Sequence, residues 1–304
     1  MAKILATATL PATMGEWVQG WIGGREALVS LVVGWSGSVE LCILDRGEVF
    51  LRAGEKTLRA FETAKQIFSC CGNNAVIPED GFINVINTLP PTRGLATSTM
   101  DIAGTFAVCA AYTGSTLPDE KLFSLCAGIE PSDGIMFKGL ALVDHINGKL
   151  IERLPPPPDI NIVALIPSRT LDTADYRRDP AILEAVRANS SEHESAYELL
   201  KRGLSEGDAT LVAKAATRSA ETQQNIMPRD EWDIVSGIGG RSGAIGIAIA
   251  HSGTAMGLLF APSNKFGAEL AENMLRDAYS GPNAPKATVR RTTVSSGGFL
   301  AEKI

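Results

Sequence analysis

The segment PPTRGLATSTMD, residues 90–101, places a hydroxyl-rich loop directly before an almost wholly apolar helical pattern over residues 98–112. The alternating pattern of residues 82–86 predicts a strand ahead of it, so the loop connects a strand to a buried helix. The first turn of a helix has unpaired backbone N–H groups and a partial positive charge, and a phosphate group satisfies both. Gly94 would allow the backbone to approach a ligand closely. The segment therefore predicts phosphate binding, with ordinary N-capping by Ser98, the start of a capping box, as the alternative.

The composition is that of an ordinary globular protein, with 45% hydrophobic and 20% charged residues in 304 positions. The 28 basic and 34 acidic residues give a formal net charge of −6, which argues against nucleic acid or an anionic membrane surface as the main partner. Five cysteines without CxxC spacing favour free thiols in a reducing compartment. The N-terminal sequence lacks the long apolar segment of a signal peptide. We therefore expect a cytoplasmic protein with no nucleic-acid partner and no membrane partner.

One segment, residues 243–262, carries no Lys, Arg, Asp or Glu and is almost long enough to span a membrane. Its centre, residues 251–254, is polar and contains a glycine, so two buried strands around a turn are expected instead. Other familiar motifs are missing from the sequence: it has no P-loop, no GxGxxG after an early strand and no GxSxG elbow. Its three histidines are far apart, which argues against a histidine metal site or a serine-hydrolase triad.

Four consecutive prolines, Pro155–Pro158, interrupt the sequence near its middle. Such a run fits neither a helix nor a central strand and forms a stiff extended connection. We predict an N-terminal domain over residues 1–154 and a C-terminal domain over residues 159–304. Strand and helix patterns mix without a regular βαβ rhythm, which favours an α+β fold.

Local patterns predict the individual elements. Besides those already named, strands are expected over residues 27–33, 39–44, 160–166 and 288–295. Helices are expected over residues 58–68, 119–128, 181–202, 208–223 and 266–275. Residues 237–241, rich in glycine, are expected to form a flexible loop.

The loop before the buried helix resembles the second motif of the GHMP small-molecule kinases, Pro-x-x-x-Gly-Leu-x-Ser-Ser-Ala, with Thr97 replacing the first serine and Thr99 the alanine. Four further segments, in the same order along the chain, are similar to the L-threonine kinases of cobalamin biosynthesis. They are PATMGEWVQGW at 11–21, IEPSD at 129–133, the proline run at 155–158 and AHSG at 250–253. In the first of them Thr13-Met14 replaces Ser-Cys, and the third superfamily motif lacks its run of three glycines.

The resemblance implies the two-domain GHMP fold, with an N-terminal domain like ribosomal protein S5 domain 2, a ferredoxin-like C-terminal domain and ATP in the cleft between them. The residues that it places on ATP are Pro91, Arg93, Gly94, Leu95, Ala96, Thr97, Ser98 and Thr99. It implies that Asp133 is the catalytic carboxylate and that Ser98 and Glu130 hold Mg²⁺, with Glu120 as a competitor for the second position. A solvated loop after a helix is the alternative for both carboxylates.

The first and third motifs are expected to face the substrate. A carboxylate at Glu16 and an amide at Gln19 would suit the amino and carboxylate groups of an amino acid; an early loop that supports a strand is the alternative. Ser252 and Gly253 are expected to reach the substrate from the second domain, whereas His251 is expected to be a packed core residue.

The function implied by the resemblance is phosphorylation of L-threonine by ATP and Mg²⁺, giving O-phospho-L-threonine for the aminopropanol linker of cobalamin. The alternatives are a GHMP kinase for another hydroxylated metabolite, of the homoserine or pantoate type, and a GHMP-fold protein that binds ligand without catalysis. A monomer or a homodimer is expected.

Overall fold

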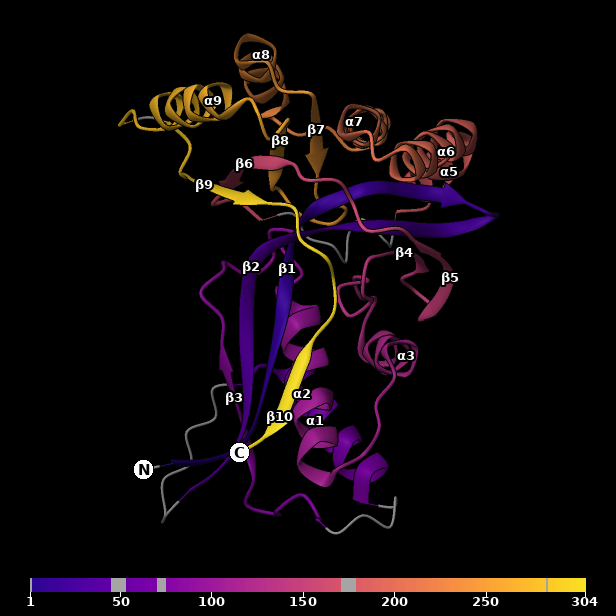
Figure 1. Ribbon diagram of the computed structural model, residues 1–304, viewed down its shortest axis with the longest axis vertical. Helices are drawn as coiled ribbons and strands as arrows, with labels where there is room; N and C mark the ends of the chain where they lie inside the picture. Colours follow the sequence, from indigo (N-terminus) through magenta and orange to yellow (C-terminus); the bar gives the residue numbers. More distant parts are fainter. Residues whose placement is uncertain (1, 45–52, 70–74, 171–178, 283) are drawn as a thin grey trace.

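The computed structural model describes residues 2–44, 53–69, 75–170, 179–282 and 284–304. Its strands are β1 (Ala2–Ile22), β2 (Arg25–Leu44), β3 (Phe82–Ile86), β4 (Leu140–Asp144), β5 (Lys149–Leu154), β6 (Asn161–Pro167), β7 (Gly246–Ile249), β8 (Met256–Phe260), β9 (Ala287–Thr293) and β10 (Leu300–Lys303). Its helices are α1 (Glu55–Ser69), α2 (Thr97–Thr113), α3 (Asp119–Ile129), α5 (Pro180–Ala188), α6 (Ser190–Glu206), α7 (Ala209–Ile226), α8 (Trp232–Ser242) and α9 (Lys265–Ala278). The molecule is elongated, with α1 to α3 in its lower part and α5 to α9 in its upper part (Figure 1).

A long hairpin of β1 and β2 runs through both parts (Figure 1). Its turn is formed by Gly23 and Gly24, whose positive φ angles of 60° and 75° suit a two-residue hairpin. Register shifts on both sides of Glu16 mark irregular pairing, and such bulges bend a strand and redirect its side chains. The sequence predicted two short strands in place of β2 and none over β1. The strands predicted within β2 were too short and β1 was missed, because the polar and glycine positions of the hairpin interrupt its apolar pattern.

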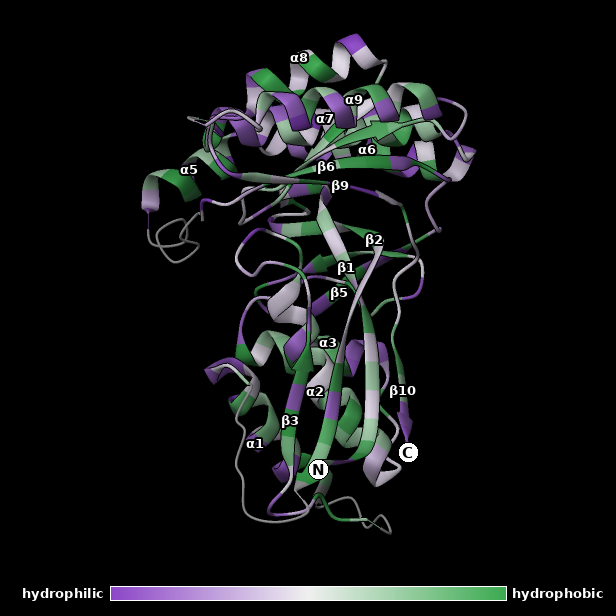
Figure 2. Cartoon of the chain, turned by 90° about the vertical axis from the view of Figure 1, so that its left-hand side faces the viewer, coloured by the Kyte–Doolittle hydropathy of each residue, from purple (hydrophilic) through white to green (hydrophobic). Residues whose placement is uncertain are grey.

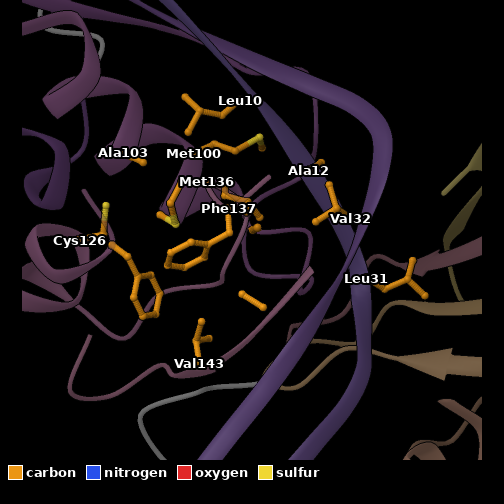
Figure 3. Packing of buried hydrophobic residues seen from close by; sticks show 14 of the residues in the cluster. Leu10, Ala12, Leu31, Val32, Met100, Ala103, Cys126, Met136, Phe137 and Val143 are labelled. Atoms are coloured by element: carbon orange, nitrogen blue, oxygen red, sulfur yellow. The ribbon is translucent and has the colours of Figure 1, made fainter. Parts of the chain in front are cut away.

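In the lower part, helices α1 to α3 lie on one side of the hairpin, which β3 extends at β2 and β10 extends at β1 (Figure 1). The α2 helix is buried along most of its length, as the apolar pattern predicted. Leu10 of β1 and Met100 of α2 pack in the core beside Phe137, which follows the IEPSD segment (Figure 3). The helix that starts at the predicted phosphate loop is therefore anchored in the main core.

In the upper part, the strand order β9-β6-β8-β7 is antiparallel throughout. Helices α5 to α8 connect β6 to β7, and α9 connects β8 to β9, which is the βαββαβ order of a ferredoxin-like domain. Figure 2 shows α7, α8 and α9 together on one side of β6 and β9. The pairing of Glu16 with Ile249 joins β7 to β1, so the sheets of the two parts are continuous.

Several local expectations can be compared with these elements. Residues 243–262 form β7 and β8 around a turn, as expected. Residues 237–241 lie inside α8, so the predicted flexible loop was wrong. The pattern over 181–202 forms two helices, α5 and α6, which meet at Asn189. Among the described residues, no helix is both long and apolar enough to cross a membrane.

The division of the chain at Pro155–Pro158 stays a prediction. These residues form no helix or strand and lie between β5 and β6. The chain returns to the lower part at its end, where β10 pairs with residues 6–9 of β1. Cys42, Cys109 and Cys126 are buried free thiols, as expected, and the adjacent Cys70 and Cys71 lie outside the described residues.

Candidate active site

Three segments that are distant in the sequence meet at the start of α2. The N–H of Gly15 in β1 donates to the carbonyl of Gly94 at 3.4 Å, and the N–H of Ala255 donates to the carbonyl of Arg93 at 3.1 Å. The loop before α2 is therefore held between the hairpin and the turn that joins β7 to β8. The three motifs singled out in the sequence surround one place in the structure.

Contact between this loop and the β7–β8 turn leaves no room for a side chain at Gly253. A Cβ atom there would lie 2.1 Å from the carbonyl carbon of Arg93, well inside any real contact. The glycine of AHSG is thus explained by close packing of two backbones. This close packing places Ser252, the residue before Gly253, beside the loop that precedes α2.

The α2 helix begins at Thr97, after Ala96 in the left-handed conformation with φ of 57°. Ala96 has no side-chain oxygen to cap the helix, and Ser98 lies one residue inside it, so the predicted capping box is not formed. The helix start instead borders a pocket of about 140 Å³. Its lining residues are Lys56, Thr92, Gly94, Leu95, Ala96, Thr97, Ser98, Thr99, Glu130, Pro131, Asp133 and Ser252.

Glu130, which follows the last turn of α3, is held at this pocket by two side chains. Ser98 donates its hydroxyl hydrogen to one carboxylate oxygen, and the Lys56 ammonium on α1 pairs with the other. Ser98 and Glu130 are thus adjacent oxygen donors, as a shared Mg²⁺ would require. The competitor Glu120 lies at the opposite end of α3, where it pairs with Arg153.

Asp133 lies opposite the first turn of α2 and contacts Thr99. The Thr99 hydroxyl donates to a carboxylate oxygen of Asp133 at 3.1 Å and accepts the N–H of Asp133, also at 3.1 Å. Thr99 is only 3% exposed. Its hydroxyl was expected at the ATP phosphates, but in the structure it is engaged by Asp133, which leaves its backbone N–H for that role.

Glu16 is a buried carboxylate on β1, 3% exposed. Burial, together with the neighbouring Asp133 carboxylate, raises the pKa of Glu16 well above its ordinary value, and a hydrogen bond from Ser30 partly opposes this. One of its oxygens, Oε2, has no hydrogen-bond partner among the described residues. A cationic or hydrogen-donating group of a ligand would satisfy that oxygen.

Gln19 is also buried, and its amide is engaged within the protein. Its Oε1 lies 2.7 Å from Nδ1 of His251, and its Nε2 donates to the carbonyl of Ile249 at 3.4 Å. The amide therefore supports the β7–β8 turn. His251 is buried at 7% exposure, as expected for a packed histidine.

Pro91 and Arg93, expected at the nucleotide, lie at the entrance of the loop outside the residues that line the pocket. Nη1 of Arg93 donates to the Pro91 carbonyl at 3.1 Å, and Nη2 donates to the carbonyl of Ser168 beyond β6. In this arrangement the guanidinium ties the loop to the upper part of the molecule.

Sequence reasoning missed two residues beside the site, Lys56 and Ser30, and it singled out Asp101 only as part of a capping box. Burial raises the pKa of Asp101 to about 6, while a hydrogen bond from Asn87 opposes the shift. Asp101 stood in the loop motif, and its i, i+3 spacing from Ser98 placed both on one face of the helix. Lys56 and Ser30 belong to no motif, so only the fold could find them.

Comparison with known proteins identifies the family of the chain. Residues 56–137 match the family described as the GHMP kinases N terminal domain. An L-threonine kinase of Citrobacter freundii is 30% identical over 259 residues, covering 84% of this chain and 86% of that protein. The chain belongs to the GHMP kinases. It is therefore a phosphotransferase with an alcohol group as acceptor.

Other GHMP kinases are similar over most of the chain. A homoserine kinase of Prochlorococcus marinus is 26% identical over 261 residues, covering 81% of this chain and 77% of that protein. The crystal structure of a homoserine kinase from Cytophaga hutchinsonii aligns with a TM-score of 0.67 at 14% identity, covering 99% of this chain and 97% of that chain. The expected α+β fold of this family is confirmed.

Proposed function

We propose that this GHMP kinase transfers the γ-phosphoryl group of ATP to the hydroxyl of L-threonine, giving O-phospho-L-threonine. The observation that carries the proposal is the buried Glu16 carboxylate beside Asp133, which itself lines the pocket at the start of α2. A buried carboxylate oxygen without a partner favours an acceptor that brings an ammonium group next to its hydroxyl. The relative named L-threonine kinase favours threonine among such acceptors.

The nucleotide is assigned to the start of α2. The backbone N–H groups from Gly94 to Thr99 and the helix dipole would neutralise the phosphates of ATP. Ser98 and Glu130 fit Mg²⁺, because kinase Mg²⁺ sites combine one or two protein oxygen ligands with phosphates and water. When bound, the ion would neutralise charge on the phosphates. Among the described residues no group of three or more His, Cys, Asp or Glu could hold a metal by itself, so the phosphates are part of the proposed site.

Asp133 is assigned to the acceptor hydroxyl. Thr99 donates to Oδ2 of Asp133, and the Asp133 carboxylate would accept or orient the hydroxyl proton of the substrate as it attacks. Ser252 and Gly253 would border the acceptor from the upper part. A contact of Gln19 with the substrate carboxylate would require its amide to exchange the hydrogen bonds to His251 and Ile249, so we assign Gln19 to the support of that turn.

Homoserine is the second candidate acceptor, because the Prochlorococcus relative is named homoserine kinase and its substrate also carries an ammonium group. A pantoate-type acceptor lacks that ammonium group and could offer the Glu16 carboxylate only a hydroxyl. Retention of Asp133 beside the phosphate loop argues against a protein that only binds ligand. A role in formation of the cobalamin linker, a cytoplasmic location and a monomeric or dimeric state remain part of the proposal.

The test is ADP release from ATP and Mg²⁺ with L-threonine, L-homoserine and pantoate, followed by identification of the phosphorylated product. We expect O-phospho-L-threonine and the highest kcat/KM with L-threonine. Turnover of homoserine without turnover of threonine would replace the substrate. No turnover with any acceptor, by a folded protein that binds ATP, would favour the binding protein.

A further inference from the structure

Two buried hydroxyl groups hold adjacent peptide units of the loop that carries Asp133. The N–H of Asp133 donates to Oγ1 of Thr99 at 3.1 Å, and the N–H of Gly134 donates to Oγ of Ser30 at 3.2 Å. Thr99 lies on α2 and Ser30 on β2, and each side chain is 3% exposed. The loop is thus held by hydrogen bonds to both α2 and β2.

Each hydroxyl also has one hydrogen to donate, and each gives it to a carboxylate of the site. Thr99 donates to Oδ2 of Asp133 at 3.1 Å. Ser30 is the register partner of Glu16 on the paired strand β1, and the hydrogen bond that its hydroxyl offers lowers the pKa of that carboxylate. The two hydroxyls therefore connect the same short loop to both carboxylates, to Asp133 through Thr99 and to Glu16 through Ser30.

We propose that Thr99 and Ser30 are positioning residues that fix the carboxylates of Asp133 and Glu16 relative to each other and to the start of α2. The inference rests on the proposed function, which assigns the acceptor to these carboxylates. Since Thr99 belongs to the first turn of α2, it links the place of the phosphates to the group that faces the attacking hydroxyl. A small displacement between the two costs much of the rate in a transfer reaction that depends on alignment.

This role differs from a phosphate contact by the Thr99 hydroxyl. That hydroxyl has a single hydrogen, and Asp133 receives it, so none is left for a phosphate oxygen. Loss of the hydroxyl should therefore lower kcat and leave the KM for ATP almost unchanged. Loss of a hydroxyl that binds phosphate would instead raise the KM for ATP and change kcat less.

The kinetic experiment compares Thr99→Val, which keeps the shape of the side chain, with Thr99→Ser, which keeps the hydroxyl. Thr113→Val is the matched control, because Thr113 lies at the far end of the same helix and is equally buried. We expect Thr99→Val to lower kcat about 100-fold, with less than about a threefold change in the KM for ATP. Thr99→Ser should recover kcat to within about fivefold of the native enzyme, and Thr113→Val should stay within about twofold.

A second measurement needs no turnover and follows amide hydrogen exchange of residues 130–134 in the free protein. Thr99→Val should speed exchange at Asp133, and Ser30→Ala should speed it at Gly134, each at least about tenfold relative to Thr113→Val. Unchanged exchange in both variants would overturn the proposal, as would a native kcat in Thr99→Val or a Thr99→Ser variant as slow as Thr99→Val. A native protein that phosphorylates no acceptor would refute the proposed function, whereas the exchange result would still decide whether the two hydroxyls hold the loop.

Discussion

Gly94 and Ala250 are packed so closely that a Cβ atom on Gly94 would lie 2.1 Å from the Cβ of Ala250. Gly94 belongs to the loop before α2, and Ala250 begins the turn after β7. The same glycine has a φ of 80°, a conformation that other residues rarely adopt. One position thus joins the loop before α2 in the lower part to the ferredoxin-like upper part.

A Gly94→Ala variant should lose both this contact and the backbone geometry of the loop. We expect it to lower the free energy of unfolding by about 2–4 kcal/mol, from overpacking and left-handed strain together, and to raise the KM for ATP. Gly114→Ala is the control, because Gly114 has a similar φ of 71° with no atom within 4 Å of its added Cβ. Urea denaturation of both variants separates the two contributions. Equal losses in both would show that the contact with Ala250 is unimportant.

An Asp133→Asn variant should fold normally but have a much lower kcat. Asparagine has nearly the same shape but cannot take the proton of the acceptor hydroxyl, so kcat should fall by at least about 100-fold. The KM for ATP should change little, since the phosphates are assigned to α2. The exposed Asp159→Asn serves as the control in the same ADP-release assay. Near-native turnover by Asp133→Asn would remove this carboxylate from the mechanism.

Glu16→Gln should change stability in a pH-dependent manner. Burial and the nearby Asp133 raise the pKa of Glu16, so the folded protein retains this proton to higher pH than the unfolded chain. Stability from this group is therefore fully present below the unfolded pKa near 4.5 and is lost as pH rises toward the folded value. Glutamine avoids that loss.

The variant should thus be more stable than the native protein by about 1–3 kcal/mol near pH 8, and the difference should shrink as the pH falls toward 4.5. Chemical denaturation of the two proteins at several pH values measures it. Glu16→Gln should also raise the KM for L-threonine, because the ammonium group would lose its carboxylate. A stability difference that is independent of pH would contradict the buried charge.

Much of the site was predictable because its residues lie in short local motifs. The loop at 90–101 combines a glycine with an apolar helical pattern, and both signals are local. The IEPSD segment identified Glu130 and Asp133, and the structure brings both to the loop. The assignment of Ser98 with Glu130, in preference to Glu120, needed the fold, because α3 places the two glutamates at its opposite ends.

The features that the sequence did not predict depend on pairing between residues that are far apart in the chain. No periodic signal marks β1, because bulges near Glu16 interrupt the alternation that is typical of a strand. Ser30 becomes part of the site only because the hairpin register pairs it with Glu16 and its hydroxyl accepts the N–H of Gly134. The Thr99 hydroxyl looked like a phosphate ligand in its motif, and only the position of Asp133 revealed another partner for it.

Lys56 provides the last test, since no motif contains it and the fold alone brings it to the pocket. Its ammonium pairs with Glu130, but its side chain is 56% exposed, so the ion pair should add less than about 1 kcal/mol to stability.

Beside the proposed phosphate site, the same positive charge should contribute more to the binding of ATP than it does to stability. Lys56→Met should raise the KM for ATP about fivefold, which corresponds to about 1 kcal/mol, with a free energy of unfolding near the native value. Lys65→Met, on the same helix but paired with Glu62, should leave the KM unchanged. Equal effects of the two substitutions would mean that α1 contributes only general positive charge, and the placement of Lys56 at the nucleotide would have to be abandoned.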